Sequence, residues 1–355
     1  MIKCFDSDIS VEEKQALDDI INTRVLAFGP KVQEFEKRYE TYSKKSFNVG
    51  FNSASSAAYL LYQYFLNKFG SCRVYTTSLG FVSPVTAALK NKHEVVYVDV
   101  DENLLMSCDD LKDKFINDGK TSIIMPVLYG GVSAISGFEQ FCKSNNCILV
   151  LDSAHCISPT MNYDYAFYSF HPVKPICMSN GGLLSTDDDH AAEFMFSGRN
   201  FGRIIMGDTY DLGQVGFNFY MNNLNAALGL VQLEKCENNV QKRKDNFNFL
   251  KQNLPSNLGY LTEHDAGSSY YLSSLVLKKS FSSGNMRKYL GDKGIQSSFH
   301  YPFLHTSSFY KDGSTLQKLD DFKDRIINLP IHQNLEKQDL EKILDECIRY
   351  SRGGS

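Results

Sequence analysis

The chain has 355 residues, of which 43% are hydrophobic and 22% are charged, so it has the composition of a folded protein rather than a disordered one. Its formal net charge of −4 and its scattered lysines give no general attraction to nucleic acid or to an anionic membrane. The nine cysteines show no metal-ligand spacing and no apolar run approaches the ~20 residues that span a bilayer, so we expect a cytoplasmic protein with reduced thiols, no metal and no membrane contact.

The first half of the chain alternates between short apolar runs and amphipathic stretches. This alternation predicts a largely parallel sheet covered by helices on both faces, because parallel strands need crossover connections. Ligands then bind at the carboxyl ends of the strands. Strand patterns cover 47–52, 72–77, 94–98, 122–128, 147–151, 165–169 and 183–185, and helical patterns cover 55–68, 81–91, 108–118 and 134–145.

The second half begins with a long helical pattern at 223–252, which ends at Asn253-Leu254-Pro255. The regular alternation of strand and helix patterns then stops, and the segment "SYYLSSLVL" is followed by helical patterns at 285–293 and 337–350. The length of the chain also favours one large and one smaller domain. We therefore expect a large domain over 1–240 and a smaller α+β domain over 241–352.

Asp152 and Lys174 each follow a predicted strand. The segment "ILVLDSAHCI" leads an apolar strand into Asp152, where a buried carboxylate needs a positive partner. Lys174 stands between Pro172 and Pro175, whose fixed φ angles stiffen the loop. A strand-end Asp alone is more often a helix cap, and a lone loop lysine is more often solvated. Together the two residues favour a reactive, desolvated amine such as a Schiff-base lysine.

Several small or aromatic residues lie at other strand-to-helix junctions. Ser55 and Ser56 belong to the turn "NSASSAAYLL", whose backbone N–H groups can hold a phosphate at a helix N-terminus. Phe81 and His155 could cover the two faces of a flat ring. Each also has a plain structural interpretation, namely helix capping for the serines and core packing for the two rings. Asn218 lies in the loop before the long helix, where turn chemistry is the simpler explanation.

Nine segments in this order resemble the sugar aminotransferases of the DegT/DnrJ/EryC1/StrS family. The likeness covers nearly the full chain, and no single motif carries it alone. The segments are "LAFGPKVQEFEKRYETY", "NSASSAAYLL", "IIMPVLYGG", "VLDSAH", "YSFHPVKPI", "NGGLLST", "GFNFYMNNLNAALGLVQLEK", "FHYPFLHTSSFY" and "NLPIHQNLEKQDLEKIL".

The resemblance implies a pyridoxal 5′-phosphate (PLP) enzyme of fold type I, with a three-layer α/β/α large domain around a mostly parallel seven-stranded sheet. By the same resemblance Lys174 forms the Schiff base, Asp152 pairs with the pyridinium nitrogen, and His155 and Phe81 flank the ring. Ser55, Ser56 and Ser169 match the phosphate-binding hydroxyls. Asn218 matches an asparagine that reaches the phosphate of a neighbouring subunit, which implies a homodimer with shared active sites.

The resemblance further implies an aminotransferase that takes the amino group of L-glutamate and gives it to a keto sugar. In the family this sugar is most often nucleotide-linked and destined for polysaccharide or glycoconjugate biosynthesis. Family members that act as dehydratases carry His at the position of Lys174. Two alternatives stay open: an unlinked keto sugar or keto-polyol phosphate as substrate, and a non-catalytic PLP-binding regulatory protein.

Four positions depart from the family pattern. The loop 177–180 replaces a threonine-rich stretch and a glutamate, Phe201 stands for a histidine, and Tyr220 stands for an arginine. The segment "GSCRV" near residue 73 replaces an acidic approach to the strand. The first three are expected to lie in loops that touch substrate, so the reaction type is better determined by the sequence than the identity of the sugar.

Overall fold

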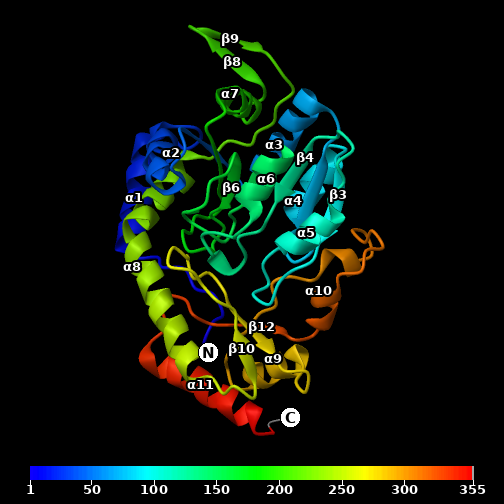
Figure 1. Cartoon of the computed structure of the whole chain (residues 1–355). Helices are drawn as coiled ribbons and strands as arrows, with labels where there is room; N and C mark the ends of the chain where they lie inside the picture. Colours follow the sequence, from blue (N-terminus) through cyan, green and yellow to red (C-terminus); the bar gives the residue numbers. More distant parts are fainter. Residues whose placement is uncertain (354–355) are drawn as a thin grey trace.

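A seven-stranded sheet forms the centre of the computed structural model, which describes residues 1–353 (Figure 1). The strand order is β1-β7-β6-β5-β4-β2-β3. Only β7 runs antiparallel to its neighbours, β1 and β6, so the predicted mostly parallel sheet is confirmed. The strands are β1 (Phe47–Phe51), β2 (Arg73–Thr77), β3 (Glu94–Val98), β4 (Ser122–Met125), β5 (Ile148–Asp152), β6 (Tyr165–Ser169) and β7 (Gly182–Thr186).

Helices cover both faces of this sheet. One face packs on α3 (Ala54–Phe69), α4 (Val82–Lys90) and α7 (Asp189–Gly198) through the strand residues Val74, Ile123 and Val150. The other face packs on α2 (Pro30–Ser43), α5 (Cys108–Lys114), α6 (Phe138–Asn145) and the start of α8 through Tyr75, Ile124 and Leu149. Adjacent strand residues enter opposite cores because side chains alternate across a strand. The predicted three-layer α/β/α architecture is thereby confirmed.

Helix α8 (Asn223–Asn253) extends from this core to a second sheet (Figure 1). That sheet is antiparallel, in the order β10 (Gly259–Leu261), β11 (Ser273–Leu277) and β12 (Ile326–Leu329). It is packed by α9 (Ser283–Asp292) and α11 (Lys337–Ser351), and the short helix α10 (Gln317–Asp321) shares a hydrophobic core with β11 and β12. Ile2 belongs to the same core. The division into 1–240 and 241–352 stays a prediction.

Several elements were not predicted from the sequence, among them α2, α7, α10, β10 and β12. Helix α1 (Val11–Thr23) packs on α8, and the hairpin of β8 (Arg203–Met206) and β9 (Thr209–Leu212) projects beyond α7 at one end of the molecule (Figure 1). Two single 3₁₀ turns cover Tyr129–Gly131 and Leu304–Thr306. Two predicted helices are shorter than expected, since α5 ends at Lys114 and α6 begins at Phe138. Among residues 1–353 no helix has the length and apolarity needed to span a membrane.

Candidate active site

A cavity of about 340 Å³ opens where β5 and β6 end, β7 begins and α3 starts. This is the sheet edge at which the alternating pattern predicted a ligand. Five of the predicted site residues line it: Ser55, Phe81, Asp152, Ser169 and Lys174. The other lining residues are Ser53, Ala54, Ser83, Pro84, Ala154, Phe167, His171, Val173, Asn180, Gly181, Tyr271, His300 and Tyr301.

A larger cavity, of about 670 Å³, lies at the opposite sheet edge and contains none of the predicted residues. Its lysines are already paired, Lys45 with Asp187 and Lys120 with Glu94. Asp188 there accepts a hydrogen bond from Tyr165 at 2.6 Å. Because the smaller cavity holds the buried amine and carboxylate, it is the candidate active site.

Lys174 and Asp152 are the two charged groups of the candidate site. Lys174 is only 8% exposed and Asp152 only 2% exposed. Burial lowers the pKa of Lys174 to about 7, although the charge of Asp152 acts in the opposite direction. Burial raises the pKa of Asp152 to about 6, opposed by the Ala154 N–H at 3.0 Å and by Lys174. At neutral pH a fraction of the lysine is therefore an uncharged nucleophile and most of the aspartate is ionised.

The loop that carries Lys174 is closed by backbone hydrogen bonds. Phe170 N–H donates to Gly181 O at 3.0 Å, and Met178 N–H donates to Phe170 O at 2.8 Å. Inside the loop, Lys174 N–H donates to His171 O at 2.8 Å. With the flanking prolines, these bonds fix the backbone of the lysine, as the sequence predicted.

The start of α3 forms a small-residue turn at the cavity wall. Ser53 caps the helix, because its hydroxyl accepts from Ser56 N–H at 3.1 Å. Ser55 lines the cavity, whereas the Ser56 hydroxyl donates to Asn52 Oδ1 at 2.6 Å. A Cβ on Gly182 would lie 2.2 Å from the Ser53 carbonyl carbon, so only glycine allows β7 to approach this turn. The turn offers N–H groups and the Ser55 hydroxyl to an anion.

His155 lies outside the cavity lining, in contrast to Phe81, which is half exposed in its wall. The ring accepts a hydrogen bond from Gly130 N–H at Nδ1, 3.3 Å away, and its Nε2 lies 2.9 Å from the Tyr301 hydroxyl. Burial, with the charges of Lys174 and His300, lowers the pKa of His155 well below its usual value. The imidazole is therefore neutral. Its predicted contact with a ring stays a prediction.

Asn218 and the departures from the family pattern occupy different surroundings. Asn218 does not line the cavity, and its backbone carbonyl accepts from Asn52 Nδ2 at 3.1 Å. Asn180 lines the cavity, whereas Cys177 is buried with its thiol 3.3 Å from Gln232 Oε1. Phe201 is partly exposed before the hairpin. A role of Asn218 across a subunit boundary stays a prediction.

Three aromatic lining residues were missed from the sequence. The Lys174 amine lies 4.1 Å from the centre of the Tyr271 ring, and His300 and Tyr301 complete that wall. Tyr271 belongs to the stretch "SYYLSSLVL", whose residue pattern predicts a strand and gives no sign of a binding role. His300 and Tyr301 stand in the segment "FHYPFLHTSSFY", whose place in the family order was the only signal available.

The residues present fit PLP. The cavity presents an amine with a lowered pKa, a buried carboxylate and the start of a helix, which suit an aldehyde, a ring nitrogen and a phosphate. The close approach that Gly182 permits keeps the helix start at the cavity wall. Within residues 1–353 no group of three His, Cys, Asp or Glu side chains could hold a metal ion.

Comparisons with known proteins show the family and the fold of the chain. Residues 7–347 match the model of the DegT/DnrJ/EryC1/StrS aminotransferase family. The UDP-4-amino-4,6-dideoxy-N-acetyl-beta-L-altrosamine transaminase of Helicobacter pylori is 27% identical, over 95% of this chain and 94% of that protein. The structure of Helicobacter pylori PseC, an aminotransferase involved in the biosynthesis of pseudoaminic acid, superposes with a TM-score of 0.92, at 23% identity and 98% coverage of both chains. A Streptococcus pneumoniae sugar aminotransferase in its PLP form gives a TM-score of 0.88, at 22% identity and 98% coverage of both chains.

Proposed function

Because the chain belongs to the DegT/DnrJ/EryC1/StrS aminotransferase family, we propose that it transfers an amino group from L-glutamate to a nucleotide-linked keto sugar. The aminotransferases of this family depend on PLP, and because the dehydratases related to them carry His at the position of Lys174, the lysine in this chain supports amino transfer. The observation that carries the assignment of the site is the pair of buried groups at the sheet edge, a lysine with a pKa of about 7 and an aspartate with a pKa of about 6.

Lys174 and Asp152 have separate tasks in this proposal. When bound, PLP supplies an aldehyde for the amine and a ring that accepts electrons as a C–H bond breaks. The Lys174 amine would hold the aldehyde and, when free, would accept and return a proton at Nζ. A pKa of about 7 suits both directions of that transfer at neutral pH. The ionised Asp152 carboxylate would hold the protonated ring nitrogen.

The remaining predicted residues would bind and orient the cofactor. Ser55 and Ser169 would hold the phosphate with the N–H groups at the start of α3, and Ser56 would join them once its hydroxyl turns away from Asn52 Oδ1. Phe81 and His155 would flank the ring. Asn218 would reach the phosphate of a neighbouring subunit, so that each site needs two chains of a homodimer.

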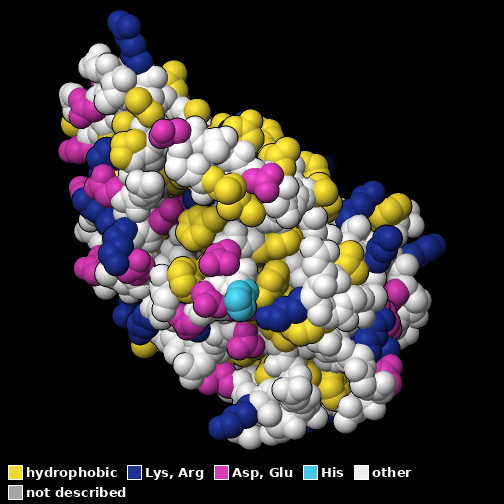
Figure 2. Space-filling model, turned by 90° about the horizontal axis from the view of Figure 1, so that it is seen from above, with side chains coloured by type: hydrophobic (Ala, Val, Ile, Leu, Met, Phe, Trp, Pro, Cys, Tyr) yellow, Lys and Arg dark blue, Asp and Glu magenta, His cyan; other side chains and the backbone are white. Residues whose placement is uncertain are grey.

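The exposed hairpin supports this assembly. Six hydrophobic side chains of β8, β9 and the following segment are at least 48% exposed: Ile204, Ile205, Met206, Tyr210, Leu212 and Val215. Figure 2 looks down on this end of the molecule and shows hydrophobic side chains gathered across it. Such a surface is typical of an interaction site.

The nine free cysteines, most of them buried, support a reducing compartment such as the cytoplasm.

The substrate class rests on the relatives. The Helicobacter pylori relative is named for a UDP-linked amino-dideoxy sugar, which supports a nucleotide-linked keto-deoxy sugar and a place in polysaccharide or glycoconjugate biosynthesis. Asn180 stands in the cavity wall where the family carries a glutamate, and this change favours an unlinked keto sugar as the second candidate.

The substrate class is tested by mixing the aminated form of the cofactor-loaded protein with a panel of keto sugars. Nucleotide-linked keto sugars should convert the cofactor back to PLP. Re-oxidation by unlinked sugars alone would support the second candidate instead.

The role of Lys174 is tested by borohydride reduction of the PLP-loaded protein followed by peptide mass spectrometry. We expect a pyridoxyl group on the peptide that contains Lys174. The Lys174→Ala variant should lack both this mass and the absorbance band that glutamate bleaches in the wild-type protein. Lys143→Ala, a change of an exposed lysine, serves as control and should retain both. A tag on another lysine would contradict the proposal.

A further inference from the structure

The ring of Tyr271 contacts the amine of Lys174. Nζ lies 4.1 Å from the ring centre, and both side chains are buried. The face of an aromatic ring attracts an ammonium group through its quadrupole, without taking a proton from it. The ring can therefore fix the position of the amine and leave it free to react.

Two further rings hold Tyr271. Phe5 stacks on it, with ring centres 5.6 Å apart and planes 25° apart, and the His155 ring centre lies 4.5 Å away. Phe5 also meets the edge of His300, another lining residue, at 5.0 Å. A residue from the first few positions of the chain thus supports the aromatic wall of the candidate site.

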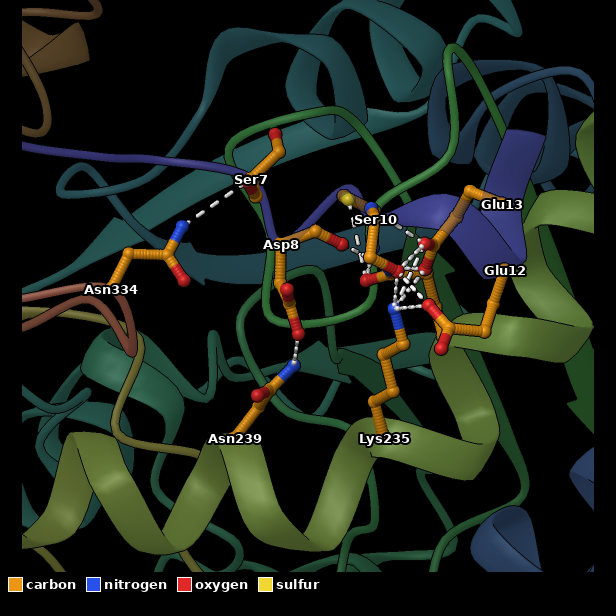
Figure 3. Close-up of polar contacts among 10 residues, drawn as sticks. Ser7, Asp8, Ser10, Glu12, Glu13, Lys235, Asn239 and Asn334 are labelled. Atoms are coloured by element: carbon orange, nitrogen blue, oxygen red, sulfur yellow. Dashed lines mark hydrogen bonds and ion pairs between the residues drawn. The ribbon is translucent and has the colours of Figure 1, made fainter.

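The N-terminal segment that carries Phe5 is fastened along its backbone. Four of its carbonyl groups accept hydrogen bonds from side chains of α8 or of the loop before α11. Asn239 Nδ2 also donates to the Asp8 carboxylate at 3.0 Å, and Lys235 pairs with Glu13 at 2.8 Å, as Figure 3 shows. The four bonds are Lys3 O with His332 Nε2 at 3.1 Å, Asp6 O with Gln333 Nε2 at 3.1 Å, Ser7 O with Asn334 Nδ2 at 3.2 Å and Asp8 O with Gln232 Nε2 at 2.6 Å.

The same segment contacts the loop of the reactive lysine. The Ser7 hydroxyl donates to Pro172 O at 2.8 Å, two residues before Lys174. Cys177, on the far side of the loop, lies against Gln232, whose amide also donates to the buried Glu13. Residues 3–8 therefore brace the lysine loop through Ser7 and the ring beside its amine through Phe5.

We propose that Tyr271 is a positioning residue for the amine of Lys174 and that residues 3–8 hold both in place. This inference rests on the proposed function for the importance of Lys174, but its geometry does not depend on the cofactor. The titratable groups that face the amine, apart from Tyr271, are Asp152, His155, His171 and His300. Burial lowers the pKa of all three histidines, and that of His300 to about 4, so Asp152 and the ring are the groups that favour the ammonium form.

The first experiment compares Tyr271→Leu, which removes the ring, with Tyr271→Phe, which removes only the hydroxyl. The pH dependence of Lys174 acylation is measured by mass spectrometry on the full chain before PLP is added. Because the ring favours the ammonium form, Tyr271→Leu should lower the midpoint by about one pH unit, and Tyr271→Phe should leave it in place. An unchanged midpoint in Tyr271→Leu, or an equal shift in both variants, would overturn the role of the ring.

The second experiment tests the N-terminal segment and does not depend on whether Tyr271→Leu folds. In Ser7→Ala the bond to Pro172 O is lost, so amide hydrogen exchange over residues 170–178 should become faster. Ser71→Ala is the matched control, since the Ser71 hydroxyl donates to Lys92 O at 2.7 Å elsewhere on the surface. Equal exchange in wild type and Ser7→Ala would refute the bracing of the loop.

The two proposals fail in different ways. A pyridoxyl tag on another lysine would refute the proposed function, and the acylation midpoint of Lys174 would still report the effect of Tyr271. An unchanged midpoint would refute the positioning role, and the tag would still identify the reactive lysine.

Discussion

Lys174 has a charge whose burial destabilises the fold. Its pKa is about 7 in the folded protein and 10.5 in its ordinary state. Between these pH values the unfolded chain binds more protons than the folded one, so stability rises with pH in that window. Below about pH 7 the full penalty remains. Asp152 has the opposite effect at lower pH, because its pKa is raised from 3.8 to about 6 and stability falls as pH rises between these values.

The double variant Lys174→Met/Asp152→Leu tests this charge balance in the cofactor-free protein. Replacing both members of a buried ion pair with apolar side chains of similar volume should stabilise the fold at pH 7 by about 1–4 kcal/mol, whereas removing the lysine alone would leave the Asp152 carboxylate buried without its partner. The gain should shrink as the pH rises from 7 towards 10, because the wild-type lysine then loses its charge. Urea denaturation at several pH values measures the difference. A gain that stays constant over this range would show that the amine is not desolvated.

At this scale the sequence predicted the groups whose chemistry requires a particular residue type. Lys174, Asp152, Ser55, Ser169 and Phe81 all line one cavity. Their signal was local, since each stands beside the end of a strand or the start of a helix. Tyr271 and His300 come from segments about 100 residues further along the chain, and an aromatic side chain in a strand or loop has no local pattern that indicates a partner.

Three elements meet at the buried ion pair of Glu36 and Arg199. Glu36 comes from α2 and Arg199 follows α7, and both also bind the backbone of Gly50 in β1. The Arg199 guanidinium donates to Gly50 O at 2.6 Å, and the Glu36 carboxylate accepts from Gly50 N–H at 2.7 Å. The pair therefore joins β1, the edge strand that leads to the turn at Ser53–Ser56, to its two neighbouring helices.

Glu36→Gln should destabilise the fold by about 3–5 kcal/mol, because it leaves the Arg199 charge buried without its partner. Glu34→Gln, two residues earlier on the same helix, is the control. Glu34 pairs with Lys31 and Arg38 at the surface, where an ion pair contributes about 0–1 kcal/mol. Denaturant titration of both variants distinguishes the two sites. Equal losses would contradict the difference in burial.

Gly182→Ala tests the close approach of β7 to the start of α3. The added Cβ would lie 2.2 Å from the Ser53 carbonyl carbon, so the turn must move away from the cavity. We expect a loss of about 1–3 kcal/mol in stability and weaker PLP binding, measured by cofactor titration. Gly291→Ala in α9 is the control, because nothing lies within 4 Å of its added Cβ. PLP binding as tight as in the wild type would argue against this turn as the phosphate site.

Elements were predictable from the sequence where burial produced a pattern. Six of the seven strands of the central sheet are buried over most of their length, with β3 as the exception, and each of the seven was predicted within three residues of its ends. The hairpin of β8 and β9 is exposed on nearly every residue, so no alternation of apolar and polar residues marks it. Helix α2 buries only a narrow stripe that includes Val32, Phe35 and Tyr39, and charged residues obscure its periodicity.

The whole molecule presents an unusually apolar end. Ile205 in the hairpin and Val215 in the segment after it are each 69% exposed, and the hairpin projects away from the core (Figure 1). Neither residue contributes to the hydrophobic cores of the described chain. Side chains of this kind are stabilised when a second copy covers them. The packing of a single chain does not explain why these side chains are apolar, whereas burial in the proposed homodimer interface would explain it.

Ile205→Asp tests the homodimer, because a charge at the tip of the hairpin disfavours burial against a second copy. We expect the variant to be monomeric by light scattering and to lose amino transfer, since each site would lack the Asn218 of its neighbour, and to keep its circular dichroism spectrum. Phe309→Asp is the matched control, because Phe309 is 79% exposed but far along the chain from the hairpin. It should stay dimeric and active. A monomeric wild type with full activity would refute the shared site, and a dimeric Ile205→Asp variant would remove the hairpin from the interface.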